Sequence, residues 1–134
     1  TAKQRKPLPQ KETVFLLLVH QQKLLLEKRP SSGIWGELWC PPETETGVDI
    51  ASYCHDHLGI QIQSAIQLPA LDHQFTHYKL RIHPQLLSVT SGSFIEKNEF
   101  IWIKPCDALE RAIPTPVRKL LKHNFLSNHH TLTI

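Results

Sequence analysis

The sequence predicts an α+β domain. Two apolar runs, 13–20 and 23–28, lie close enough together to pair as a hairpin. A segment rich in glycine, proline and tryptophan at 30–42 leads into a short amphipathic helix at 49–58, and a further helix begins at Thr115. The resulting order of two strands, a loop, a helix, three strands and a helix is typical of the α+β class.

The N-terminal half is expected to contain a hairpin, a loop and a helix. The first two strands join across His20-Gln21-Gln22, and their near-continuous Leu and Val content predicts burial on both faces. The composition of 30–42 favours a structured loop. The helix ends before Gly59, which we expect to be left-handed, because glycine caps helix C-termini in that conformation.

The C-terminal half is expected to contain three strands, a short helical turn and one helix. In the longest strand, successive side chains alternate between two faces. Thr115 is expected to cap the last helix, with Pro116 at its first position and an apolar stripe behind it. The predicted segments are strands at 60–68, 70–83 (continuing past Pro84 through 85–89) and 94–104, a turn at 91–93, a helical turn at 105–111, and a stripe of Val117, Leu120, Leu121 and Phe125.

Length and charge indicate one domain preceded by a basic arm. The 134 residues are 40% hydrophobic, enough for one core without covalent cross-links. Four of the 15 basic residues precede every acidic one, which leaves 11 bases against 12 acids after residue 11. The net charge of +3 is too small to mark the whole chain as a nucleic-acid binder. We expect an interdomain linker arm at 1–12, a domain at 13–126 and a tail at 127–134, excised from a longer protein.

Cysteine usage and hydropathy indicate an intracellular protein. Cys40, Cys54 and Cys106 are widely spaced and form no C-x-x-C pair, so we expect free thiols in a reducing compartment. The longest apolar run, Val14 to Val19, is far shorter than a membrane span. The basic, proline-bearing N-terminus does not resemble a signal peptide.

The Gly/Trp segment and the helix ending in Leu58-Gly59-Ile60 resemble a Nudix hydrolase domain. In that family the helix reads R-E-U-x-E-E-x-G-U, and its glutamates hold Mg²⁺ on a diphosphate. Aligned on the Gly-Ile pair, this chain has Ser52 at the arginine, Tyr53 at the first glutamate, and Asp56 and His57 at the last two. One carboxylate of three remains. The resemblance therefore implies a mixed sheet flanked by helices, without the hydrolase.

Further segments are similar to the C-terminal domain of A/G-specific adenine DNA glycosylases, the MutY family. The family's H-x-F-[ST]-H-x-x-L motif matches residues 73–80. Glu37 stands where that family usually has a second glycine, and Pro41 where an aromatic residue is common. The other matching segments are Phe15-Leu16-Leu17-Leu18, Leu25-Leu26-Glu27-Lys28-Arg29-Pro30, Ser32 through Glu43, and Ile113 through Leu121.

The resemblance implies a non-catalytic role in DNA repair. In the MutY family an N-terminal domain with a 4Fe-4S cluster excises adenine, and the C-terminal domain recognises the opposing 8-oxoguanine. This chain has neither a helix-hairpin-helix sequence nor a four-cysteine motif, so we expect no catalytic residue, metal or cofactor in it. The implied partners are duplex DNA containing 8-oxoguanine:adenine and the catalytic domain of the same enzyme. The implied state is a monomer in the bacterial cytoplasm, at the nucleoid.

Thr76 is the predicted lesion-reading residue. Guanine oxidation makes N7 a hydrogen-bond donor and adds the O8 acceptor, and one hydroxyl can pair with both. Thr76 matches the family's lesion-reading Ser/Thr. Beside it, we expect Phe75 to wedge or stack near the lesion and His77 to hydrogen-bond the lesion base or a phosphate. Lys79 and Arg81 resume positive charge after an acidic stretch, so they are candidate phosphate contacts.

Other readings of the same residues remain open. Thr76, Lys79 and Arg81 also suit a solvated strand face. Phe75 also suits a core-facing strand position, and His77 also suits an ordinary strand side chain with its hydrogen bonds satisfied. His73 and His77 would lie about 13 Å apart along a strand, too far for one metal ion. Trp35, Trp39 and Trp102 are expected in the core or under the Gly-rich loop. For the whole domain, the alternatives are a Nudix hydrolase of an oxidised nucleotide and a protein-interaction module of a repair complex.

Overall fold

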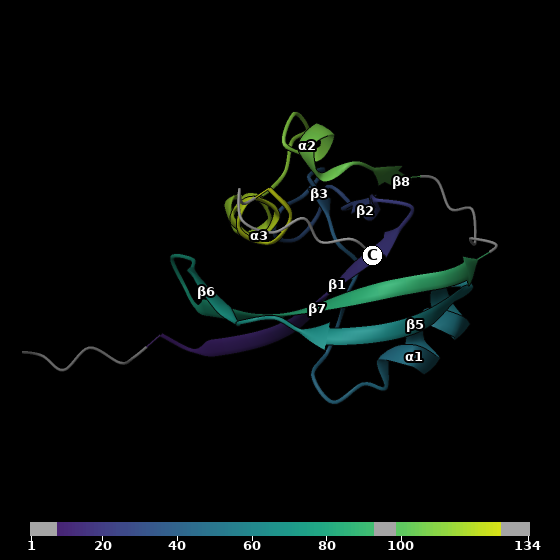
Figure 1. The fold of residues 1–134 in the computed structure, drawn as a ribbon. Helices are drawn as coiled ribbons and strands as arrows, with labels where there is room; N and C mark the ends of the chain where they lie inside the picture. Colours follow the sequence, from purple (N-terminus) through teal and green to yellow (C-terminus); the bar gives the residue numbers. More distant parts are fainter. Residues whose placement is uncertain (1–7, 93–98, 127–134) are drawn as a thin grey trace, which may run out of the picture.

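β1 (Gln10–His20) is one of the two central strands of the sheet in the computed structural model, which describes residues 8–92 and 99–126. It pairs in parallel with β7 and antiparallel with β2 and β4 (Figure 1). The main strand order is β3-β2-β1-β7-β5, with β6 beside β7 and β8 beside β2. The other strands are β2 (Lys23–Lys28), β3 (Trp39–Cys40), β4 (Glu43–Thr44), β5 (Ile60–Gln67), β6 (Leu71–Gln74), β7 (Lys79–Gly92) and β8 (Phe100–Ile103).

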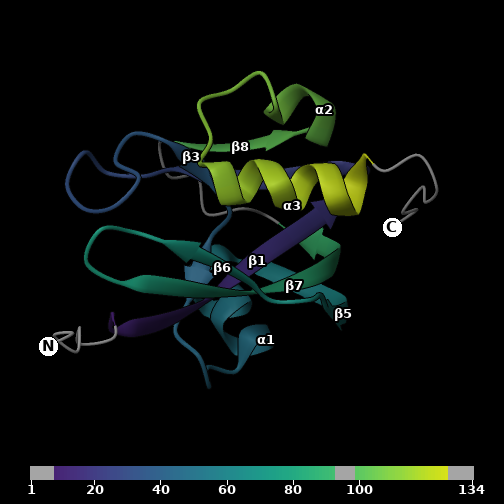
Figure 2. The same cartoon turned by 90° about the vertical axis from the view of Figure 1, so that its left-hand side faces the viewer.

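Helices cover both faces of this mixed sheet, which confirms the α+β prediction. Figure 2 shows α3 on one side of β1 and α1 on the other. The α1 helix continues into a turn of π-helix, η1, and ends at Gly59, whose φ of 65° confirms the predicted left-handed cap. The helical elements are α1 (Ile50–Tyr53), η1 (Cys54–Leu58), α2 (Pro105–Ala108) and α3 (Thr115–Phe125). In the part of the chain that the structure describes, no helix has the length and hydropathy needed to cross a membrane.

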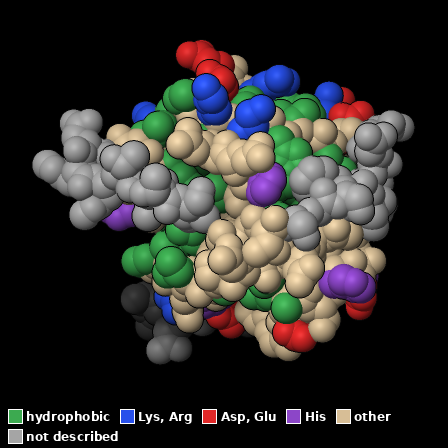
Figure 3. Space-filling model, turned by 45° about the vertical axis from the view of Figure 1, so that its right-hand side comes forward, with side chains coloured by type: hydrophobic (Ala, Val, Ile, Leu, Met, Phe, Trp, Pro, Cys, Tyr) green, Lys and Arg blue, Asp and Glu red, His purple; other side chains and the backbone are tan. Residues whose placement is uncertain are grey.

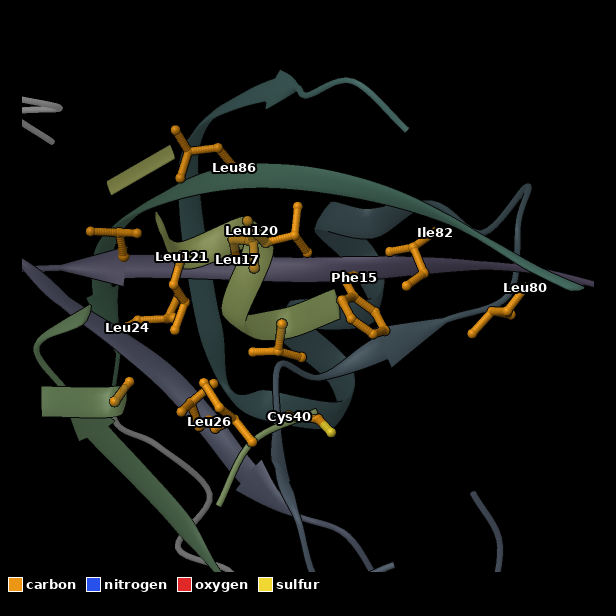
Figure 4. Packing of buried hydrophobic residues seen from close by; sticks show 14 residues of the cluster. Phe15, Leu17, Leu24, Leu26, Cys40, Leu80, Ile82, Leu86, Leu120 and Leu121 are labelled. Atoms are coloured by element: carbon orange, nitrogen blue, oxygen red, sulfur yellow. The ribbon is translucent and has the colours of Figure 1, made fainter. Parts of the chain in front are cut away.

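β1 is buried on both faces, as its composition predicts. Its side chains alternate between two hydrophobic clusters: Phe15 and Leu17 point into one, Leu16 and Leu18 into the other. The first cluster packs under α3 through residues such as Leu121 (Figure 4). The second packs against η1. Trp35 and Trp39 border the first cluster and Trp102 the second, as expected for tryptophans at the core.

The prediction of one strand over 70–83 is wrong. Residues 71–74 form β6 and residues 79–92 form β7, and the two strands pair as an antiparallel hairpin. A period-of-two alternation looks the same in one long strand as in two strands joined by an even number of residues. The pattern therefore could not reveal the turn at 75–78.

Three other boundaries differ from the predictions. β7 runs through Pro84 as expected, but it also includes Ser91 and Gly92, which were assigned to a turn. Pro114, not Thr115, is the N-cap of α3, because its carbonyl accepts the Arg118 N–H at 3.0 Å. β1 begins inside the predicted arm, so residues 10–12 belong to the sheet.

The remaining segments agree or fall outside the described part. Gln21 and Gln22 both have positive φ, as a two-residue hairpin turn requires, which confirms the first hairpin. β8 lies within the predicted strand 94–104, of which residues 94–98 are outside the described residues, as are Ser93, residues 1–7 of the arm and the tail at 127–134.

The Gly36-Glu37 pair should respond to substitution in opposite directions. A Cβ at Gly36 would lie 2.5 Å from the Ser31 carbonyl oxygen, so Gly36→Ala should destabilise the domain by roughly 1–3 kcal/mol. Glu37 has φ of 61°, a left-handed conformation that favours glycine. Glu37→Gly should therefore stabilise it by about 0.5–1 kcal/mol. Urea unfolding of both variants tests this, and a destabilised Glu37→Gly protein would contradict it.

Candidate nucleic-acid interface

The connection between β6 and β7 presents the predicted lesion-binding residues at an exposed turn. The last cross-strand pair is Gln74 with Lys79, so residues 75–78 form a four-residue connection, called the tip below. The Phe75 N–H donates to the Tyr78 carbonyl at 2.8 Å and closes it. Thr76 and His77 are exposed at its apex, so the three residues predicted to bind the lesion do lie together.

A series of aromatic contacts connects the tip to the core. The Phe75 ring lies 4.8 Å from that of Tyr78, 4.7 Å from His73 and 5.5 Å from Trp35, measured between centroids. Trp35 in turn lies 6.2 Å from Phe15, which is completely buried. Trp35 belongs to the loop before β3, which projects from the same side of the molecule as the tip (Figure 2). These contacts fix the position of an otherwise exposed turn.

The three residues predicted to bind the lesion differ in how accessible their side chains are to a ligand. Phe75 is half-buried and its ring faces three other rings, so its structural reading is favoured over a role as a wedge in DNA. Within residues 8–92 and 99–126, the side chains of Thr76 and His77 form no hydrogen bond or ion pair. Their polar groups therefore face solvent and can bind a ligand without breaking an internal contact.

The cations predicted to meet phosphates differ as well. The Arg81 guanidinium binds both carboxylate oxygens of Asp72, at 2.9 and 3.2 Å. These hydrogen bonds lower the pKa of Asp72, so the carboxylate stays charged and neutralises Arg81 down to acidic pH. Lys79 is exposed and forms no ion pair with any described residue. Lys79 is therefore the better candidate of the two for a phosphate contact.

A third cation, Lys11, lies at the tip although the sequence placed it in the linker arm. Its Nζ lies 4.4 Å from the centroid of the Tyr78 ring. No local pattern could have revealed this, because the contact depends on the parallel pairing of β1 with β7. Another side of the molecule, shown in Figure 3, has most of its visible Lys and Arg side chains along the upper edge, with acidic side chains among them.

The helix that aligns with the Nudix motif carries one carboxylate, Asp56, where the motif has three. Tyr53 and His57, at two of the glutamate positions, stack on each other at 4.4 Å. Asp56 lies 3.0 Å from the Nδ1 atom of His55 and is exposed. Among the described residues, no three His, Cys, Asp or Glu side chains are placed to hold a metal ion. These residues do not fit the Mg²⁺-diphosphate chemistry of a hydrolase.

A pocket of about 490 Å³ lies beside this helix. Tyr53 and His57 form part of its wall, together with Arg29 and Glu37 from the loop before β3. Arg29 forms an ion pair with Glu43, which also accepts a hydrogen bond from Thr13. These internal pairings make Arg29 and Glu43 structural groups that hold the loop on β1.

The fold and the sequence have clear relatives. A family model described as a NUDIX domain matches residues 13–123. The chain belongs to the NUDIX domain family. Its fold is similar to the MutT protein from Methanosarcina mazei Go1 (TM-score 0.75, 14% identity, 94% of this chain and 100% of that one). It is also similar to the NUDIX domain of Shewanella oneidensis NrtR (TM-score 0.65, 14% identity, 95% and 94%). These matches confirm the Nudix-like fold.

The resemblance to adenine DNA glycosylases is also confirmed. The adenine DNA glycosylase of Buchnera aphidicola subsp. Acyrthosiphon pisum is 29% identical over 126 residues, covering 92% of this chain and 35% of that protein. The corresponding protein of Buchnera aphidicola subsp. Baizongia pistaciae is 30% identical over 125 residues, with the same coverage. This NUDIX domain therefore spans about 35% of the length of these curated relatives.

Removing Trp35 should loosen the tip. Trp35→Ala should destabilise the domain by roughly 2–4 kcal/mol and speed hydrogen exchange at the Phe75 amide. Trp35→Phe keeps an aromatic ring, so its effects on stability and on the exchange rate should be smaller. Trp102→Ala, in the other cluster, is the matched control. If Trp35→Ala and Trp102→Ala accelerate exchange at Phe75 equally, the ring contacts do not fix the tip.

Proposed function

We propose that this domain recognises 8-oxoguanine opposite adenine in duplex DNA, as the non-catalytic part of an adenine DNA glycosylase. The observation that carries the proposal is the exposed hydroxyl of Thr76, which has no hydrogen-bond partner among the described residues and lies on a turn fixed to the core through Phe75 and Trp35. The relatives named adenine DNA glycosylase supply the context, because this chain matches about a third of their length. The partner is then the catalytic domain of the same protein, in the cytoplasm at the nucleoid.

The chemistry of Thr76 matches the edge that distinguishes the oxidised base. The N7–H of 8-oxoguanine donates to the Thr76 oxygen, and the hydroxyl proton is free to point at O8. Guanine has neither the N7–H nor O8, so it can make neither of these bonds and can only accept the hydroxyl proton at N7. The discrimination therefore depends on a group that both donates and accepts at one position.

The neighbouring residues have supporting roles in this proposal. His77 is exposed beside Thr76 and is available to a base edge or a phosphate. Phe75 acts from below, by holding the turn through its contacts with Trp35 and Tyr78. Lys79 meets the DNA backbone, while Arg81 contributes less because Asp72 already neutralises it.

A Nudix hydrolase acting on an oxidised nucleotide is the alternative enzyme. It requires carboxylates where this chain has Tyr53 and His57. The purified domain should show no Mg²⁺-dependent diphosphate cleavage. Cleavage that disappears in Asp56→Asn would replace our proposal with the hydrolase. If instead the intact protein captured repair proteins after nuclease treatment and showed no lesion preference, the protein-interaction module would replace it.

Thr76→Val keeps the side-chain shape and removes the hydroxyl, so it should reduce the preference for 8-oxoguanine:adenine over guanine:adenine duplexes. The expected loss is roughly 5- to 150-fold, corresponding to about 1–3 kcal/mol for an unpaired polar edge. Thr76→Ser retains the hydroxyl and should retain the preference. Single-turnover adenine excision by the intact glycosylase measures it, and an unchanged preference in Thr76→Val would refute the role of Thr76.

A further inference from the structure

We propose that Lys11 binds a DNA phosphate beside the lesion-reading tip. This inference rests on the proposed function, because it assumes that the tip faces duplex DNA. It adds a contact from β1, a strand far from the tip in the sequence, to a site otherwise built from β6 and β7.

The pairing of β1 with β7 places Lys11 at the tip. In this parallel pair Gln10 is opposite Lys79 and Lys11 is opposite Leu80. The Lys79 N–H donates to the Pro9 carbonyl at 2.9 Å, which ties the start of β1 to the start of β7. The chain therefore enters the domain directly beside the residues that read the base.

The ring of Tyr78 holds the ammonium group of Lys11 in place. The Nζ atom lies 4.4 Å from the ring centroid, within the range of a cation–π contact. The Tyr78 ring itself packs 4.8 Å from Phe75, so its position is fixed by the aromatic contacts of the tip. The ring contacts only one side of the ammonium group, which has three N–H donors. Because the Lys11 side chain is exposed, donors remain for a ligand.

The neighbouring charges leave Lys11 available to an anion. In the described ranges 8–92 and 99–126, Lys11 forms no ion pair. The adjacent Glu12 has its own partner, since its Oε1 atom lies 2.7 Å from Nε2 of His83. Arg81 is paired with Asp72. None of these residues supplies Lys11 with a counter-ion, so Lys11 can contact a phosphate and release a cation condensed on the DNA without breaking an ion pair.

A phosphate contact predicts a change in salt dependence without a change in base preference. A plot of log affinity against log salt concentration has a negative slope. Lys11→Gln in the intact glycosylase should make that slope less steep by about 0.9, the contribution of one phosphate contact. It should weaken binding to 8-oxoguanine:adenine and guanine:adenine duplexes by the same factor. Lys11→Arg should retain the slope. Lys23 is an exposed lysine at the start of β2, opposite His20 at the far end of β1, so Lys23→Gln is the matched control and should leave the slope unchanged.

The result separates a phosphate contact from a purely structural one. If Lys11→Gln leaves the slope unchanged, or lowers the base preference at constant slope, Lys11 only braces Tyr78 and the inference is refuted. The Thr76→Val measurement tests the proposed function separately. An unchanged preference in Thr76→Val with a reduced slope in Lys11→Gln would refute lesion reading and keep the phosphate contact. A reduced preference in Thr76→Val with an unchanged slope in Lys11→Gln would refute only the phosphate contact.

Discussion

The parallel pairing of β1 with β7 is the constraint on which the rest of this structure depends. It runs from Gln10 opposite Lys79 to Val19 opposite Ser88 and places both strands at the centre of the sheet. Because β1 is buried on both faces, a shift of one residue would exchange its two hydrophobic clusters, so the register is strongly specified. The same register brings the start of the domain to the tip. One pairing thus determines the core and the composition of the candidate interface.

In the candidate site a rigid sheet holds a short exposed loop, an arrangement that is common in binding sites. Here the rigidity reaches the loop through aromatic rings, from the buried Phe15 through Trp35 and Phe75 to Tyr78. The polar groups at the apex carry no internal contacts within the described residues. In a Nudix hydrolase the corresponding helix holds Mg²⁺, whereas here its side chains make packing contacts. Tyr53 stacks on His57. Burial raises the pKa of the Cys54 thiol to about 11, so the thiol stays neutral.

The sequence predicted the features that local chemistry controls. The burial of β1, the two-residue turn at Gln21-Gln22 and the left-handed Gly59 all follow from composition and spacing. The residues of the site were found through the H-x-F-[ST]-H-x-x-L motif, because a threonine in an alternating pattern carries no distinguishing signal. The hairpin at 75–78 was missed because alternation survives an even-numbered turn. The role of Lys11 was missed because it comes from a pairing between distant segments.

The charge distribution of this domain is compatible with the proposed local contact to DNA and disfavours strong DNA binding by the domain alone. After residue 11 it has 11 bases against 12 acids, and pairs such as Arg81–Asp72 cancel part of that charge. The proposed function depends most directly on a hydrogen bond between Thr76 and the N7–O8 edge of the lesion. A double-mutant cycle tests it directly, combining Thr76→Val with an 8-oxoguanine analogue that has carbon in place of N7. The account predicts that the effect of Thr76→Val on excision shrinks strongly with the analogue. An effect of the same size on both bases would contradict it.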